Sequence, residues 1–131
     1  MLESVSSVGT IWVTRNQQVL SVFAPLLLVT GLLGYVLPAD KSLMSGAAPY
    51  NVFHLIAGAI GLLIVLVRSG SAAIHFNLSF GVIDLYQAVA GLGGWFPAGL
   101  FELRPADHVV HVLVGLGLVV VGALGKATSL P

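Results

Sequence analysis

Apolar residues dominate four long stretches of this chain, and short polar segments separate them. A helix needs roughly 20 apolar residues to cross a bilayer core about 30 Å thick, and each stretch reaches about that length. Prolines lie at several boundaries, where a helix tolerates them at its start or just beyond its end. The pattern predicts an all-α membrane protein, a bundle of four transmembrane helices at about residues 18–37, 49–68, 72–96 and 106–125. Because only residues 69–71 join the second span to the third, we expect these two spans to be antiparallel neighbours.

The segment before the first span, residues 1–17, is predicted to be cytoplasmic or interfacial, and residues 18–126 form the transmembrane domain. Its basic residue, Arg15, comes late, and no small-residue cleavage pattern follows the apolar stretch, so the segment is not typical of a signal peptide. Pro25 lies inside the first span and predicts a bend or a frayed first turn there.

Two short patterns recur along the chain and indicate an internal repeat. The first span ends in the letters GLLGY and the third in GLGGW, sixty positions apart. The second and fourth spans share H-x-x-x-G at an offset of fifty-seven, beginning at His54 and His111. We therefore predict two tandem helical hairpins related by a pseudo-twofold axis along the membrane normal. The glycines of the first pattern are Gly31, Gly34, Gly91 and Gly94.

Polar residues inside the apolar stretches fall on one face of each helix at heptad spacing, together with many of the glycines. Helices associate in lipid through close packing at small residues and through hydrogen bonds between helices. We therefore expect these faces to point inward, with each histidine against a notch formed by one of the glycine pairs. The intramembrane polar residues predicted in this way are Asn51, His54, Asp84, Gln87 and His111, with Asp84 near the middle of the membrane.

The two repeated histidines have two interpretations. As neutral side chains, His54 and His111 could form structural hydrogen bonds across tight helix pairs. As axial ligands, they could hold a tetrapyrrole, either one haem b between them or one chlorophyll or bacteriochlorophyll each. No CxxCH motif for covalent haem is present. We predict no metal site, because His108, His111 and Asp107 in one helical turn lack a fourth ligand.

Asp84 is the one acidic residue in the middle of a predicted span, where an ionisable group is costly unless it is paired or protonated. No catalytic triad, phosphate-binding loop or HExxH motif occurs, which predicts a non-enzymatic protein. The leading hypothesis is an accessory or structural subunit docked through its glycine-rich faces onto a larger membrane complex. The alternative is a tetrapyrrole-binding subunit of a respiratory or photosynthetic complex. The third is a small proton-coupled transporter centred on Asp84, working as an oligomer.

Composition and charge agree with the membrane class. Of 131 residues, 57% are hydrophobic and 8% are charged, whereas about 25% of residues are charged in a soluble domain. The net charge of zero argues against nucleic acid as a partner, and leaves the bilayer and other membrane subunits. Basic residues favour both termini inside, with Arg15, Arg68 and Lys126 on the cytoplasmic side and Lys41 and Arg104 outside. An aromatic belt at the outer interface is predicted from Tyr35, Tyr50, Trp95 and Phe96.

Two motifs carry a resemblance to a known family. They are N-x-x-H-L-x-x-G-x-x-G from Asn51 to Gly61, and D-x-x-x-H-x-x-x-G from Asp107 to Gly115. Together they resemble a bacterial family of small four-span proteins catalogued as domain of unknown function 4383, over about residues 20–125. The resemblance implies four membrane helices, a recurring histidine–glycine pattern and the bacterial inner membrane. It implies no activity.

Overall fold

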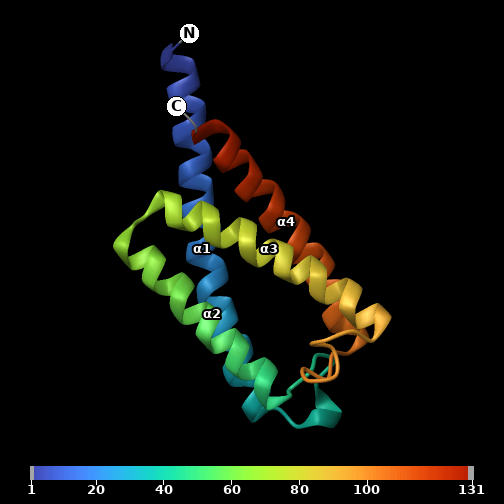
Figure 1. Cartoon of the computed structure of the whole chain (residues 1–131). Coiled ribbons are helices and arrows are strands. Elements are labelled where there is room, and N and C mark those ends of the chain that lie inside the picture. The colour runs from blue at the N-terminus through green and yellow to red at the C-terminus, as the bar shows by residue number, and fades with distance from the viewer. Residues whose placement is uncertain (1, 130–131) are drawn as a thin grey trace.

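The computed structural model describes residues 2–129, and side chains from residue 7 to residue 128. Within this range the chain is helical without strands, which confirms the predicted all-α class (Figure 1). Three of the helices contain segments long and apolar enough to cross a membrane: Ser7–Val36, Ala48–Val67 and Pro105–Thr128. The elements are α1 (Leu2–Val36), the short 3₁₀ helix η1 (Ala39–Lys41), α2 (Ala48–Val67), α3 (Gly70–Gly93) and α4 (Pro105–Ser129).

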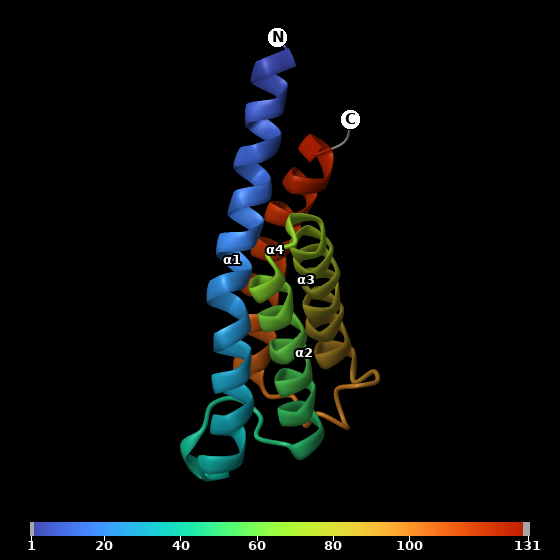
Figure 2. The ribbon, with the colours of Figure 1, turned by 90° about the vertical axis from the view of Figure 1, so that its left-hand side faces the viewer.

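The first helix is longer than its predicted span, because it begins at Leu2 and continues through Pro25 without a break. No proline interrupts the chain before Pro25, so the helix has no reason to start at residue 18. Its first half packs on the end of α4, where a Cβ at Gly9 would lie 2.7 Å from the Thr128 carbonyl oxygen. Figure 2 shows α1 extending beyond the rest of the bundle in the direction of the N-terminus. The prediction of a frayed turn at Pro25 is therefore wrong.

Helix pairing differs from the expectation drawn from the short turn. The main packing is of α1 on α2 and of α3 on α4, while α2 and α3 make few contacts and diverge from their shared turn (Figure 1). The turn itself is tight, since Arg68 ends α2 with φ 58° and the Ser69 hydroxyl accepts a hydrogen bond from the Ala72 N–H at 3.1 Å. A short connection does not decide the packing here, because the glycine faces of α2 and α4 point at α1 and α3.

The two hairpins repeat with one register. Val36 and Gly93, which end α1 and α3, lie 57 positions apart, and so do Ala48 and Pro105, which begin α2 and α4. The loops within the two hairpins therefore have the same length, and the offset of sixty proposed for the first and third spans is wrong.

Contacts at the glycines fix this register. A Cβ at Gly34 would collide with the Asn51 amide, and a Cβ at Gly91 would collide with the His108 imidazole. Both pairs are related by 57 positions. The glycine notches thus hold Asn51 and His108, and the expectation that they face His54 and His111 is wrong. Gly94 lies beyond α3 and caps it at φ 69°. Two further contacts repeat in the same register, Leu28 on Gly58 and Leu85 on Gly115.

Phenylalanine rings fill the centre of the bundle. The ring of Phe80 lies 5.4 Å from that of Phe23, in an edge-on arrangement, and stacks on Phe76 at 5.5 Å and on Phe53 at 5.7 Å. Phe23 and Phe80 are themselves 57 positions apart, so this pair marks the place where equivalent positions of the two hairpins meet. Leu27, Ala57 and Leu118 complete the buried layer around Phe80.

Candidate functional site

All five predicted intramembrane polar residues are buried, with exposed fractions between 1% and 6%. This confirms that the polar faces point inward. The residues are Asn51, His54, Asp84, Gln87 and His111. They do not form one site, however, since only three of them line a common cavity.

Tyr50 is the centre of the site. It lies in the first turn of α2 and is fully buried, with its hydroxyl 2.7 Å from Nε2 of His111 on α4. Its ring packs on the His54 imidazole at 4.1 Å and on Phe101 at 5.1 Å between centroids. The prediction that Tyr50 belongs to an outer aromatic belt is therefore wrong. The loop carrying Phe101 covers the ring and excludes it from the surface.

His54 and His111 occupy equivalent positions of the two hairpins and lie close enough to interact electrostatically. His111 uses Nε2 for the contact with Tyr50, and its Nδ1 is buried with no hydrogen-bond partner among the described residues. The site is not symmetric, because the register places Asp107 of α4 where α2 has Tyr50. This asymmetry lets the hydroxyl of one hairpin bond the imidazole of the other.

A cavity of about 110 Å³ brings Asp84 to this cluster. Its polar lining consists of Thr30, Tyr50, His54, Asp84 and His111, and apolar side chains form the rest of its wall. Asp84 is 4% exposed, and no hydrogen bond or ion pair to it occurs among the residues that the structure describes. The Asp84 oxygens are not among the fully buried unpaired atoms, since the carboxyl lines the cavity. Its place inside the bundle is still unusual, because burial of a polar group is costly unless it is hydrogen-bonded.

Asp107 connects the cluster with the loops. It is the third residue of α4, and its Oδ2 accepts hydrogen bonds from the Arg104 N–H at 2.8 Å and the Ser45 N–H at 2.9 Å. The bond to Arg104 resembles the reach-back of a capping box, in which the third helical residue bonds the N-cap amide. Asp107 also interacts electrostatically with Tyr50 and with both imidazoles of the cavity. Its Oδ1 is buried and has no partner within the described part of the chain.

The surface comes close to Asp107 at a shallow pocket of about 360 Å³. Ser45, Glu102 and Arg104 line this pocket together with Gly34 and other residues of the first loop. The Arg104 guanidinium donates to the Ala39 carbonyl at 3.0 Å and to the Ser42 carbonyl at 2.6 Å. These bonds hold the two loops together over the site, so that Ser45 lies between the pocket and the Asp107 carboxylate.

The other buried polar residues lie outside this cavity. Gln87 Oε1 is buried with no hydrogen-bond partner among the described residues, whereas the asparagines bond to separate partners. The Asn51 amide donates to the Gly46 carbonyl at 2.8 Å and closes the first loop. Asn77 of α3 donates to the side chain of Asn16 at 3.0 Å, and Asn16 donates to the Val121 carbonyl at 2.9 Å, which ties α1 to α3 and α4 at the other end of the bundle. Sequence reasoning missed Asn16, because it lies in the segment that was taken to precede the bundle.

The site offers little space for a tetrapyrrole. A cavity of about 110 Å³ is well below the roughly 300 Å³ that holds even a small drug-like ligand. Tyr50 also occupies the nitrogen of His111 that faces the other hairpin. No group of three or more histidine, aspartate or glutamate side chains in the described part of the chain is arranged to hold a metal ion.

What the arrangement provides is a set of groups that exchange protons. Hydroxyl and imidazole groups each donate and accept hydrogen bonds, and a carboxyl group does so when it is protonated. The comparisons do not add to this description: no family model matches the chain, and neither the curated proteins nor the solved structures yield a match.

Proposed function

We propose that this chain is a non-enzymatic integral membrane protein that binds protons at Asp84 and exchanges them with one membrane surface. The observation that carries the proposal is the cavity in which the Asp84 carboxyl lies with Tyr50, His54 and His111 and without a charged partner among the described residues. Ionisable residues inside membrane segments are rare, and chains of aspartate, glutamate and histidine are typical of proton relays in pumps and transporters.

The route that we propose begins at the loop pocket. Ser45 lines this pocket and its backbone N–H donates to Asp107 Oδ2, which fixes the carboxylate in place but cannot itself pass a proton. We propose that water from the pocket delivers the proton to the Asp107 carboxylate, which lies near Tyr50 and both imidazoles. The bond of 2.7 Å between the Tyr50 hydroxyl and His111 Nε2 can pass a proton, because each group is both donor and acceptor. The cavity has room for a few water molecules at about 30 Å³ each, which would link these groups to Asp84.

The route has a barrier on its other side. Toward the turn at residues 69–71, α3 places Phe80 and then Phe76 after Asp84, and Phe80 packs against Phe23 of α1. Phenyl rings have no donor or acceptor group that could pass a proton on. We therefore expect Asp84 to exchange protons with the loop end of the bundle unless Phe80 moves, and net transport to require that movement.

We also infer that α3 is a fourth transmembrane helix and that both termini lie on the cytoplasmic side of a bacterial inner membrane. With 24 residues α3 is about 36 Å long, which exceeds a bilayer core of about 30 Å. Its exposed side chains include Val82, Ile83, Val89 and Leu92, while Asn77, Asp84 and Gln87 are buried. The bacterial inner membrane rests on the resemblance in the motifs, and the orientation rests on the basic residues.

The other functions predicted from the sequence have less support. Docking as a subunit of a larger complex was expected to use free glycine faces, but Gly31, Gly58, Gly61, Gly81 and Gly115 all contact helices of this chain. The subunit role remains a prediction, and co-purification from native membranes tests it. A bound haem or bacteriochlorophyll would need Tyr50 displaced, and an absorption spectrum of the purified protein tests that idea.

Proton uptake into vesicles tests the proposed function. The purified chain is reconstituted with a pH-sensitive dye inside, and an acid pulse is given under a potassium–valinomycin potential. Where Phe80 moves and opens the route, we expect faster acidification than in empty vesicles, and a return to the empty-vesicle rate in Asp84→Asn. Asp40→Asn, which neutralises an exposed carboxylate on η1, is the matched control and should behave as the unchanged protein.

Infrared spectroscopy separates proton binding from transport. We expect a carbonyl band of a protonated buried carboxyl that is present in the unchanged protein and in Asp40→Asn, and lost in Asp84→Asn. A band without acidification would mean that Asp84 binds a proton and that Phe80 keeps the route closed. If Asp84→Asn changed neither the band nor the flux, the proposal would be wrong.

A further inference from the structure

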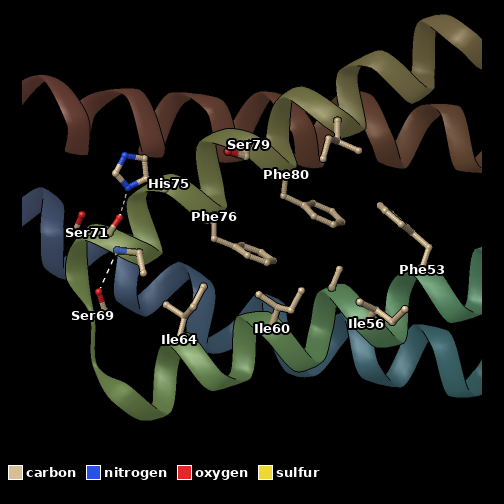
Figure 3. Close-up of a pocket in the computed structure, with 13 residues that line it drawn as sticks. Phe53, Ile56, Ile60, Ile64, Ser69, Ser71, His75, Phe76, Ser79 and Phe80 are labelled. Atoms are coloured by element: carbon tan, nitrogen blue, oxygen red, sulfur yellow. Dashed lines mark hydrogen bonds between the residues drawn. The ribbon is translucent and has the colours of Figure 1, made fainter.

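Two grooves on the surface of the bundle occupy equivalent places, each between a helix of one hairpin and a helix of the other. One lies between α2 and α3 and has a volume of about 710 Å³ (Figure 3), and the other lies between α1 and α4 with about 570 Å³. The register of 57 relates their walls, since Val19, Phe23, Leu26 and Val114 of the second groove correspond to Phe76, Phe80, Ile83 and Ala57 of the first. Both grooves therefore follow from the way in which the two hairpins cross.

Each groove is apolar along most of its length and polar at one end. In the α2–α3 groove, isoleucine and phenylalanine side chains form the walls, and Ser69, Ser71 and His75 gather near the turn (Figure 3). His75 Nδ1 donates to the Ser71 carbonyl at 2.9 Å. In the α1–α4 groove the equivalent end carries Gln18 and Arg15, joined by a hydrogen bond of 2.9 Å.

The polar end of both grooves is also the basic end of the molecule. Arg15 is exposed, and its guanidinium has five N–H donors, of which the structure assigns one to Gln18. Arg68 directly precedes Ser69 of the other groove but lines a separate pocket beside α1, so His75 is the basic residue of the α2–α3 groove itself. Among the described carboxylates, Asp84 is inside the bundle and the remaining three, Asp40, Glu102 and Asp107, lie in or beside the loops at the opposite end. An anionic group at the basic end would therefore meet no described carboxylate.

We propose that each groove binds an acyl chain of a phospholipid with an anionic headgroup, whose phosphate lies at Arg15 in the α1–α4 groove and at Ser71 and His75 in the α2–α3 groove. The two volumes fall within the roughly 300–1,000 Å³ of ligand sites. Basic pockets between membrane helices recognise anionic headgroups, since arginine and lysine near the surface attract them. The inference depends on membrane embedding and does not depend on the proton route.

Native mass spectrometry of the intact chain tests this inference. The probes are phosphatidylglycerol and phosphatidylcholine with identical acyl chains, supplied in equal amounts to the detergent-purified protein. We expect up to two phosphatidylglycerol molecules retained in preference to phosphatidylcholine. Arg15→Gln should weaken retention at one site about fivefold, since one arginine near an anionic lipid contributes about that factor.

Gly117→Leu blocks one groove without disturbing the fold. Gly117 lines the α1–α4 groove, and a Cβ there meets no atom within 4 Å, so a leucine side chain fills the groove itself. We expect the loss of one retained lipid. Gly99→Leu is the matched control, because Gly99 is equally open but lies in the loop after α3, away from both grooves. Thermal unfolding checks that both variants are folded.

Three outcomes would overturn the inference. One is equal retention of the two lipids by the unchanged protein, and another is equal retention by Gly117→Leu and Gly99→Leu. The third is a dimer that Gly117→Leu dissociates, which would assign the groove to a second copy of this chain. A failure of proton uptake would leave lipid retention unchanged, so the two proposals fail independently.

Discussion

The Tyr50 side chain connects two helices of this protein. Its ring covers His54 from the same helix, and its hydroxyl reaches His111 on α4, 61 positions later in the chain. A tyrosine near the end of a membrane helix is typically interfacial, which is why the sequence placed it in a belt. The loop containing Phe101 makes the difference, because it folds over the ring and buries it.

Removal of this hydroxyl should destabilise the protein. Tyr50→Phe keeps the ring and leaves His111 Nε2 without its partner, and an unpaired buried polar group costs about 1–3 kcal/mol. We expect a lower midpoint of thermal unfolding in detergent. Circular dichroism measures this unfolding. Tyr35→Phe is the control, since Tyr35 is exposed and its hydroxyl donates only a long hydrogen bond of 3.5 Å to the Ala48 carbonyl. Equal midpoints in the two variants would contradict this role of Tyr50.

Helix packing was only partly predictable at the scale of the elements. The small residues marked the buried faces correctly, because close backbone approach is what holds helices together in lipid. The partner of each glycine was not predictable, since Gly34 and Gly91 could accept any side chain that lies opposite. The structure places Asn51 and His108 there, one turn nearer the loops than the histidines of the repeated motif.

Paired substitutions test these two contacts. Gly34→Ala should collide with the Asn51 amide, and Gly91→Ala with the His108 ring, each at a cost of about 1–3 kcal/mol for overpacking. The double variants Gly34→Ala/Asn51→Ala and Gly91→Ala/His108→Ala should recover part of that loss, measured as a coupling free energy in thermal or denaturant unfolding. Gly117→Ala, which meets open space, is the control. Strictly additive effects in both pairs would show that these contacts do not set the register.

The topology of the whole molecule in the membrane depends on whether α3 crosses the bilayer with the other three helices. Three helices are apolar enough to cross a membrane by themselves. In α3, Asn77, Asp84 and Gln87 are buried, whereas Ser71, His75 and Ser79 are exposed. A fourth crossing would put the turn at residues 69–71 on the opposite side from the loop at residues 94–104. Without that crossing, the two segments would face the same side.

Cysteine labelling distinguishes these arrangements directly, because the chain has no cysteine of its own. We expect Ser71→Cys to react with an impermeant thiol reagent from the cytoplasmic side only, and Gly99→Cys from the opposite side only. Inverted and right-side-out vesicles supply the two accessible faces. Lys41→Cys is an internal reference for the loop between α1 and α2, and should react on the same side as Gly99→Cys. Labelling of Ser71→Cys and Gly99→Cys from the same side would exclude α3 as a span.

The sequence by itself determined that this protein is helical and apolar, and that its polar residues face inward. Hydrophobicity and spacing are local properties, and burial of polar groups away from lipid follows from their cost there. The tertiary structure decided which of these residues meet. Tyr50, His54, Asp84 and His111 come from three different helices, and their meeting in one cavity depends on a register of 57 and on the crossing of two hairpins. Side-chain packing over the whole bundle sets how the helices cross and which residues meet, and no local sequence pattern encodes that packing.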